Sequence, residues 1–347
     1  MKYKLLSVSK SPKLVGINIG DYIQALAAAQ FYPHIDGFID RDEDLKDYDG
    51  EPCKVIMNGW YMHNPENWPP SKKIVPLFVA FHLNVLAQKE LLSSPSVAYL
   101  KQFVPIGCRD LNTRDLLNKY GVDAYFSGCM TLTLGEKYHS EEKEDKTYIV
   151  DPLFNGPLDV SNILKAILEI FSHFRDIYKL YHKEQFYIHH GRNWIKKILK
   201  TALYYHEYRR VFSRDVIMTS TYICQESDYY AKQFKSDFER LNEAERLVRL
   251  YAKARLVITS RIHCALPCLG LETPVIYLEK TRDIAASSCR LGGLHDLFNV
   301  IKIDNGILVP EFKITTPITM RNIPVNKDSW RPYAEALKSR CKEFMNR

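Results

Sequence analysis

The sequence predicts an α/β protein built from two doubly wound domains that face each other across a cleft. Three observations support this fold class. Strand-like and helix-like segments alternate on both sides of about residue 145. A charged run over 136–146 separates the two halves. The segment 252–278 contains a complete strand–helix–strand unit of a parallel sheet.

The expected domain boundaries follow from this pattern. At 347 residues, the chain is long enough for two domains of ordinary size, each with its own core. We expect a first domain over residues 1–145 and a second over 146–328. A C-terminal helix over 329–347 is expected to pack back on the first domain.

Strands in the first half are expected where short apolar runs end at turn residues. They cover residues 3–8, 37–40, 54–58, 77–81, 103–107, 124–126 and 130–134. Helical spacing covers 22–30, and a second helix starts at Thr113 and ends at Gly121.

In the second half, strands are expected over 148–151, 216–219, 256–259 and 275–278. Helices are expected over 159–181, 186–212, 229–240 and 243–254. Asn242 and Glu245 have the spacing of a capping box at the start of the last of these helices.

The unit at 252–278 places polar side chains where ligands bind. Ser260, Arg261 and His263 follow its first strand, and open parallel sheets bind ligands beyond the carboxyl ends of their strands. An arginine and a histidine there could grip an anion and transfer a proton. Pro267 cannot donate to the carbonyl of His263, so irregular backbone is expected at His263. The alternative is that Arg261 and His263 form only a capping or solvated pair.

Similar polar positions occur in the first half. Asn18, Gly20 and Asp21 fit a helix start at which the glycine allows a tight turn against a ligand, although most such turns are only caps. Trp60 follows Asn58 after an apolar run. Its ring either stacks on a sugar or fills the space between a loop and the core.

Arg109 repeats the position of Arg261, because it follows the strand expected over 103–107. Two arginines from opposite halves could clamp one anion in bidentate fashion. Asp110 is expected as the ion-pair partner of Arg109, and His82 lies at the edge of the expected site.

The net charge of +7 is unevenly distributed. Residues 192–214 combine seven Lys and Arg residues and one acidic residue with Trp, Tyr and Leu at helical spacing. This pattern fits a helix at a membrane surface. It fits equally a helix with one solvated basic face and one face in the core. Binding to nucleic acid is not expected, because no recognition motif accompanies the charge.

Several classes of protein are not expected. No apolar run approaches the ~20 residues that span a bilayer, and the start of the chain lacks the features of a signal peptide. The eight cysteines include no C-x-x-C pair, so reduced thiols in a cytoplasmic protein are expected. Cys264 and Cys268 are expected as packing residues. Neither a zinc pattern nor a phosphate-binding P-loop occurs, so no metal is expected.

Three stretches, in this order, resemble the polysaccharide pyruvyl transferase family. They are NIGDYIQALA (18–27), VPIGCRDLNTRDLLNKYGVDAYFSGCMTLTL (104–134) and VITSRIHCALPCLGLETPVIYL (257–278). The resemblance implies two Rossmann-like domains in a glycosyltransferase-B-like arrangement. It also implies transfer of pyruvate from phosphoenolpyruvate onto two hydroxyls of a sugar, giving a cyclic ketal and free phosphate in bacterial-type surface polysaccharide (exopolysaccharide) biosynthesis.

The resemblance also suggests roles for the candidate residues. The donor carries a carboxylate and a phosphate, which cations and helix N-termini bind. His263 is the expected acid that protonates the enol carbon, and Asp21 is the candidate base. The candidate donor-binding residues are Arg261, Arg109, Lys280 and Ser260, and the candidate acceptor-binding residues are Asn18, Gly20, Gln24, Asn58 and Trp60. Phosphoenolpyruvate is the donor substrate, and no cofactor is expected.

Other functions remain open at this point. The acceptor could be a lipid-linked sugar, which would place the enzyme at the inner face of the cell membrane, with contact through 192–214. One alternative is a nucleotide-sugar-dependent glycosyltransferase of the same architecture, although no Glu-rich ribose-binding element appears in the second half. The other is a non-catalytic glycan-binding or lipid-binding module. Thr219-Ser220-Thr221 also stands where a histidine or basic residue was expected.

Overall fold

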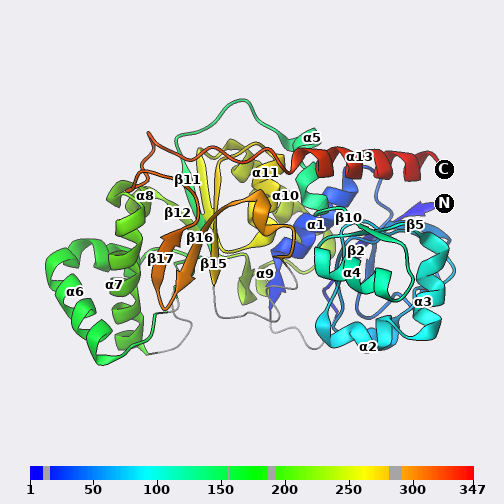
Figure 1. Cartoon of the computed structure of the whole chain (residues 1–347), viewed down its shortest axis with the longest axis horizontal. Coiled ribbons are helices and arrows are strands. Elements are labelled where there is room, and N and C mark those ends of the chain that lie inside the picture. Colours follow the sequence, from blue (N-terminus) through cyan, green and yellow to red (C-terminus); the bar gives the residue numbers. More distant parts are fainter. Residues whose placement is uncertain (11–15, 155, 187–192, 281–290) are drawn as a thin grey trace.

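The structure is a computed structural model, and it describes residues 1–10, 16–154, 156–186, 193–280 and 291–347. The chain forms a mixed α/β fold with parallel sheets, as the sequence predicts. The two halves lie side by side, and the N- and C-termini lie close together at one end (Figure 1).

The described first half contains short parallel sheets of two to four strands. One has the order β1 (Lys2–Tyr3), β5 (Cys53–Ile56), β7 (Ile74–Leu77). Another has the order β10 (Ala124–Phe126), β9 (Ile106–Cys108), β8 (Phe81–Leu83), β6 (Gly59–Tyr61). A third pairs β2 (Leu5–Ser7) with β4 (Phe38–Asp40). The expected strand 3–8 is therefore divided between two sheets, and His82 lies within a strand.

The helices of the first half begin at side-chain caps. Asn18 caps α1 (Ile19–Ala29), since its Oδ1 accepts a hydrogen bond from Gly20 N at 3.0 Å. Asp110 caps α4 (Leu111–Lys119), which therefore begins before Thr113. The remaining helices are α2 (Gln88–Leu91), α3 (Ser94–Leu100), α5 (Gly135–Tyr138) and the 3₁₀ turns 65–67, 85–87, 101–103 and 130–133.

The strand expected over 130–134 is wrong. Met130–Thr133 is a 3₁₀ turn (η4), with Leu132 N donating to Cys129 O at 3.1 Å. This apolar run is buried against helices, including a close approach of Leu132 O to Gly270, and not between strands.

The second half is organised around one six-stranded sheet. Its order is β12 (Thr221–Ile223), β11 (Thr147–Val150), β14 (Leu256–Thr259), β15 (Val275–Lys280), β16 (Asn299–Asp304), β17 (Ile307–Pro310). All neighbouring strands are parallel except β16 and β17, which form an antiparallel hairpin. The predicted strand–helix–strand unit is confirmed as β14, α11 (Ile262–Gly270) and β15.

The strand expected over 216–219 is wrong. This segment is the helix α8 (Arg214–Thr219), which Ser213 caps by accepting from Val216 N at 3.3 Å. The strand β12 begins two residues later, at Thr221. Val216 and Ile217 are buried in the core, and a short buried apolar run does not distinguish a strand from a helix.

The capping box at Asn242 and Glu245 is also wrong. The long helix α10 (Asp237–Lys253) starts earlier, and Ser236 and Glu239 make the reciprocal capping bonds. The helix α9 (Asp228–Gln233) is shorter than the expected helix 229–240.

Two long helices, α6 (Val160–Tyr181) and α7 (Trp194–Val211), stand at the end of the molecule opposite the termini (Figure 1). Most of the apolar side of α7 is in the core, where Leu203, Tyr204, Tyr205 and Tyr208 are buried, whereas Trp194 and Ile195 in the first turn are exposed. This burial matches the interpretation of 192–214 as a core helix with a solvated basic face. Residue 192 itself lies outside the described residues.

The two halves are connected by packing and by backbone pairing. A continuous core includes residues of α1, α10 and α11, so helix α1 packs on the second half. The two-residue strand β3 (Ile17–Asn18) pairs antiparallel with β13 (Glu226–Ser227). The C-terminal helix α13 (Arg331–Asn346) lies along the first half, where Lys54 Nζ donates to Phe344 O at 2.9 Å (Figure 1).

Candidate active site

A cavity of about 360 Å³ lies beyond the carboxyl ends of β14 and β15. Five predicted site residues contribute to its lining, namely Asn18, Ser260, Arg261, His263 and Lys280. Asn18 comes from the first half and the other four from the second. The position beyond the strand ends is the one expected for ligand binding in a parallel sheet, and the volume is in the range of small-molecule sites, ~300–1,000 Å³.

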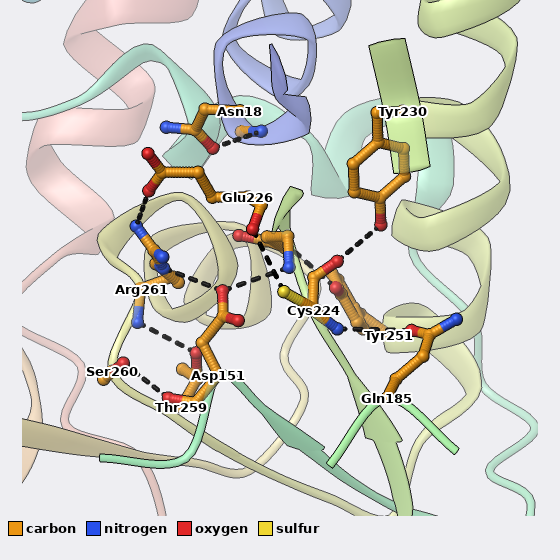
Figure 2. Close-up of polar contacts among 12 residues, drawn as sticks. Asn18, Asp151, Gln185, Cys224, Glu226, Tyr230, Tyr251, Thr259, Ser260 and Arg261 are labelled. Atoms are coloured by element: carbon orange, nitrogen blue, oxygen red, sulfur yellow. Dashed lines mark hydrogen bonds and ion pairs between the residues drawn. The ribbon is translucent and has the colours of Figure 1, made fainter. Parts of the chain in front are cut away.

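Arg261 is held by two carboxylates (Figure 2). Its Nε donates to Asp151 Oδ2 at 2.7 Å and its Nη1 donates to Glu226 Oε2 at 2.6 Å. Burial alone would lower the pKa of the Arg261 guanidinium, but the two carboxylates raise it, so the side chain stays charged. Arg261 is therefore held in ion pairs, and it is also the N-cap residue of α11, as the capping alternative expects.

The two carboxylates differ in their surroundings. Asp151 follows β11 with φ +46° and is 13% exposed; its Oδ2 also accepts from Gln225 N at 3.0 Å. Its carbonyl accepts from Ser260 Oγ at 2.6 Å. Glu226 is 53% exposed and lies opposite Asn18 in the pairing of β3 with β13. Asp151 is thus a fixed anchor for Arg261, whereas Glu226 can exchange with solvent or a ligand.

His263 occupies the predicted irregular first turn of α11. Its φ and ψ are −84° and 16°, which are not helical, and Pro267 follows in the same helix. The expectation of irregular backbone at His263 is confirmed. The side chain is 6% exposed and lines the cavity. A buried imidazole at the edge of a cavity can reach a bound substrate while being shielded from bulk water.

Gly20 has a structural role that sequence analysis does not predict. A Cβ atom at Gly20 would lie 3.0 Å from His263 Cβ, 3.2 Å from His263 Nδ1 and 2.9 Å from Asn18 Oδ1. The glycine therefore allows the first turn of α1 to approach His263 across the boundary between the halves. Gly20 does not line the cavity.

The candidate base Asp21 and two of the predicted acceptor-binding residues, Gln24 and Asn58, lie together at a separate, small cavity of about 10 Å³. Gln24 Nε2 donates to Asp21 Oδ1 at 3.1 Å, and Asn58 Nδ2 donates to Gln24 O at 3.0 Å. Arg41 joins them, with its Nη1 3.9 Å from Asp21 Oδ1. The guanidinium of Arg41 also lies over the ring of Trp60, 5.5 Å from its centre.

The structure does not bring Arg109 into the main cavity. Its side chain is fully buried, at 0% exposure, and it is not among the described residues of the cavity lining. Asp110 contacts His82, with Oδ2 2.6 Å from Nδ1, and also accepts from Thr113 N at 2.8 Å. The expectation that Asp110 serves only to pair with Arg109 is therefore wrong, because His82 and the start of α4 occupy its carboxylate.

One group of possible metal ligands adjoins the cavity. Glu279, His295 and Glu311 each offer one ligand atom, and these atoms lie within 4.8 Å of one another. The hydrogen bond that His295 Nδ1 donates to Glu279 raises the pKa of His295, and Lys302 Nζ lies 2.5 Å from Glu311 Oε1. Lys302 and, when it is protonated, His295 place positive charge beside the two carboxylates, so the group forms an ion-pair network.

Three residues of these sites are not predicted as site residues by sequence analysis. Asp151 and Arg41 each follow a strand, as Arg261 does. Their position at the carboxyl end of a strand could therefore have identified them as site residues. Glu226 gives no such signal, because its place depends on a two-residue strand pair between distant segments.

Comparison with known proteins identifies the family. The family model described as polysaccharide pyruvyl transferase matches residues 18–279. A search of the curated proteins finds no match. Among solved structures, a functionally uncharacterized protein from Klebsiella pneumoniae subsp. pneumoniae NTUH-K2044 is similar, with 13% sequence identity, coverage of 87% of this chain and 93% of that chain, and a TM-score of 0.41. The family model covers most of the chain, and the matched residues include β14, Arg261 and His263 of the cavity. The chain therefore belongs to the polysaccharide pyruvyl transferase family, and it is a transferase.

Proposed function

We propose that the protein transfers pyruvate from phosphoenolpyruvate onto two hydroxyls of a sugar unit, releasing phosphate. The observation that carries this proposal is the meeting of Arg261, Lys280 and His263 at one cavity beyond the strand ends. Two cations suit a donor with a carboxylate and a phosphate. An imidazole suits the proton transfer that the enol ester requires.

On the donor side, we assign Arg261 and Lys280 to the carboxylate and the phosphate, with Ser260 beside them. The helix α11 begins next to these residues, and its first N–H groups favour an anion. Arg109 is not included, because its buried side chain lies outside the described lining. Glu226 competes with the donor for Nη1 of Arg261, so donor binding would displace it.

The reaction requires a proton at the methylene carbon of the donor. In the proposed mechanism, His263 protonates this carbon, which becomes the methyl group, and C2 gains cationic character. One sugar hydroxyl bonds to C2, and the C2–O bond to phosphate breaks. The second hydroxyl then bonds to C2 and closes the ketal. Of the two hydroxyl protons released, one restores the acid and the other leaves with hydrogen phosphate, so atoms and charge balance.

On the acceptor side, we assign Asp21, Gln24, Asn58 and Trp60 to the sugar, with Asp21 as the base. The support is that hydrogen bonds connect Asp21, Gln24 and Asn58 on the first half, and Arg41 connects Asp21 to the ring of Trp60. Asn18 links these residues to the donor cavity, since it lines that cavity and caps α1. We further propose that the two halves act as Rossmann-like domains of a glycosyltransferase-B-like enzyme at the cytoplasmic face of the membrane, acting on a lipid-linked acceptor without a cofactor.

The direct test measures phosphate release from phosphoenolpyruvate with a panel of glycoside acceptors. A positioned general acid contributes ~10²–10⁴-fold, so H263A should lower kcat by about that factor. The exposed His34 provides the control, and H34A should be unaffected. Wild-type inactivity across the panel would contradict the proposal, and saturable binding of a nucleoside diphosphate would then favour a glycosyltransferase.

A matched pair of variants tests the assignment of Arg261. E226Q removes the competing charge at Nη1 and should lower KM for phosphoenolpyruvate. D151N removes the buried anchor at Nε and should raise KM. If both substitutions change KM in the same direction, or if neither changes it, Arg261 does not bind the donor as proposed.

A further inference from the structure

The outer face of α6 carries a line of exposed apolar side chains that passes a kink at His173, whose φ of −131° and ψ of 33° are not helical. We call this line the α6 stripe. Its residues are three or four positions apart, as one face of a helix requires, and Phe171 at its centre is 82% exposed. The α6 stripe consists of Val160, Leu164, Leu168, Phe171, Phe174 and Tyr178.

The opposite face of α6 is fixed against the protein through two buried carboxylates, whose basic partners are partly exposed. Asp176 accepts from Arg214 Nε at 2.7 Å and from Tyr205 at 2.7 Å. Glu169 Oε2 lies 2.8 Å from His206 Nδ1, and its Oε1 lies 3.1 Å from Arg209 Nε. Rotating α6 to bury its stripe would expose apolar core residues and break these ion pairs. The sequence therefore specifies that the stripe faces outward.

The exposed charges on α6 all have the same sign. The structure describes this helix in full, and its exposed charged side chains are Lys165, Arg175 and Lys179, whereas its two acidic residues, Glu169 and Asp176, are buried. An apolar line beside basic side chains is the pattern of helices that lie in the interface of an anionic membrane. The hairpin of α6 and α7 also projects at one end of the molecule, where it can meet a flat surface (Figure 1).

Arg175 distinguishes a membrane from a second copy of the chain. It is exposed and follows the kink at His173, and it lies beside Phe174 and three residues before Tyr178, so it adjoins the C-terminal part of the stripe. Packing two stripes together would bury Arg175 at an interface to which α6 brings no exposed carboxylate, and an unpaired buried charge is costly. At a lipid surface, the same side chain reaches the phosphate groups while its stem stays in the apolar layer.

We propose that α6 binds the surface of an anionic lipid membrane through the α6 stripe, with Lys165, Arg175 and Lys179 contacting lipid phosphates. This surface differs from the segment 192–214 expected from sequence, whose apolar side is mostly in the core. The proposal does not depend on pyruvyl transfer, because binding is measured without catalysis.

The test is flotation of the full-length protein with vesicles of phosphatidylcholine, alone or mixed with phosphatidylglycerol. We expect binding to the mixed vesicles that weakens as salt is added. Each basic residue contributes about fivefold to partitioning on such a surface, so R175E/K179E should lose about 25-fold or more. L168S/F171S should lose about tenfold or more, because the inserted side chains are removed.

Matched controls change the same chemistry elsewhere. L86S/V325S removes two apolar side chains that are 86% and 87% exposed, and K101E/K119E reverses two exposed lysines of the first half. Both should bind as the wild type does. Wild-type protein that stays with the soluble fraction, or stripe variants that float unchanged, would overturn the proposal. A dimer in sedimentation equilibrium that L168S/F171S converts to a monomer, without vesicle binding by the wild type, would show that a second copy is the partner.

Discussion

Replacing Gly20 by alanine should disturb the candidate active site, although the same change usually stabilises a helix. Gly20 is the second residue of α1, and alanine is favoured over glycine within helices by up to about 1 kcal/mol. Here, however, the added Cβ would lie 3.0 Å from His263 Cβ and 2.9 Å from Asn18 Oδ1. Both distances are shorter than normal van der Waals contacts.

The size of the effect follows from which atoms must move. Asn18 can rotate, at the cost of its cap, but the Cβ of His263 is attached directly to the backbone of α11. Relief therefore requires a shift of α11 relative to α1. Overpacking of this kind costs about 1–3 kcal/mol, so we expect a net loss of about 1–2 kcal/mol of unfolding free energy. A displacement of His263 approaching 1 Å could lower turnover by about 10²-fold.

Urea unfolding and phosphate release from phosphoenolpyruvate measure the two consequences of G20A. The control is a double-mutant comparison with N18A, which removes the contact to Oδ1 and leaves the contact to His263. If G20A still destabilises the protein in the N18A background, the remaining cost comes from His263. A G20A protein that is more stable than the wild type and fully active would refute the reasoning.

Three further predictions concern other sites. D176A should lower the unfolding free energy by about 1–3 kcal/mol, because it leaves the buried Tyr205 hydroxyl without its acceptor and removes the bidentate partner of Arg214; urea unfolding measures this, with D215A, which removes only a 3.9 Å contact to the same arginine, as the comparison. Glu279 raises the pKa of His295 in the folded protein, so the stabilisation from protonated His295 should be complete below the unfolded pKa of about 6.5 and be lost as pH rises through the higher folded pKa. The difference in unfolding free energy between wild type and H295A, measured by urea unfolding, should therefore shrink between about pH 6 and about pH 9. A difference that stays constant over this range would exclude the coupling. Activity should survive a chelator such as EDTA, and a loss that divalent ions restore would show that a metal is needed.

The sequence predicts the elements that have strong local signals. The unit β14–α11–β15, the long helix α6 and the irregular turn at His263 each follow from apolar patterns or from one proline, and all are present. Segments with weaker local signals are assigned the wrong secondary structure where tertiary packing determines whether a short apolar run forms a helix or a strand. The apolar run in α8 is helical because Ser213 caps it and the core surrounds it.

The hairpin of β16 and β17 shows a signal that sequence analysis overlooks. Asn305 and Gly306 connect the strands with φ of +51° and +87°, as a two-residue turn of this type requires. The partners of Arg261 have a different origin. Glu226 contacts Arg261 within the second half, on a strand, β13, that pairs with β3 of the first half, and neither two-residue strand has a local pattern that predicts the other.

The pairing of β3 with β13 makes the wall of the donor cavity depend on the relative position of the two halves. Asn18 and Glu226 are opposite each other in this pairing, and Ile19 N donates to Gln225 O at 2.9 Å. Gln225 and Asp151 are hydrogen-bonded in turn. Glu226, Asp151 and Arg261 all belong to the second half, so a rotation that separated the halves would leave these three charges together and would withdraw Asn18. The cavity would lose the part of its lining that the first half supplies, while the guanidinium kept both of its carboxylates.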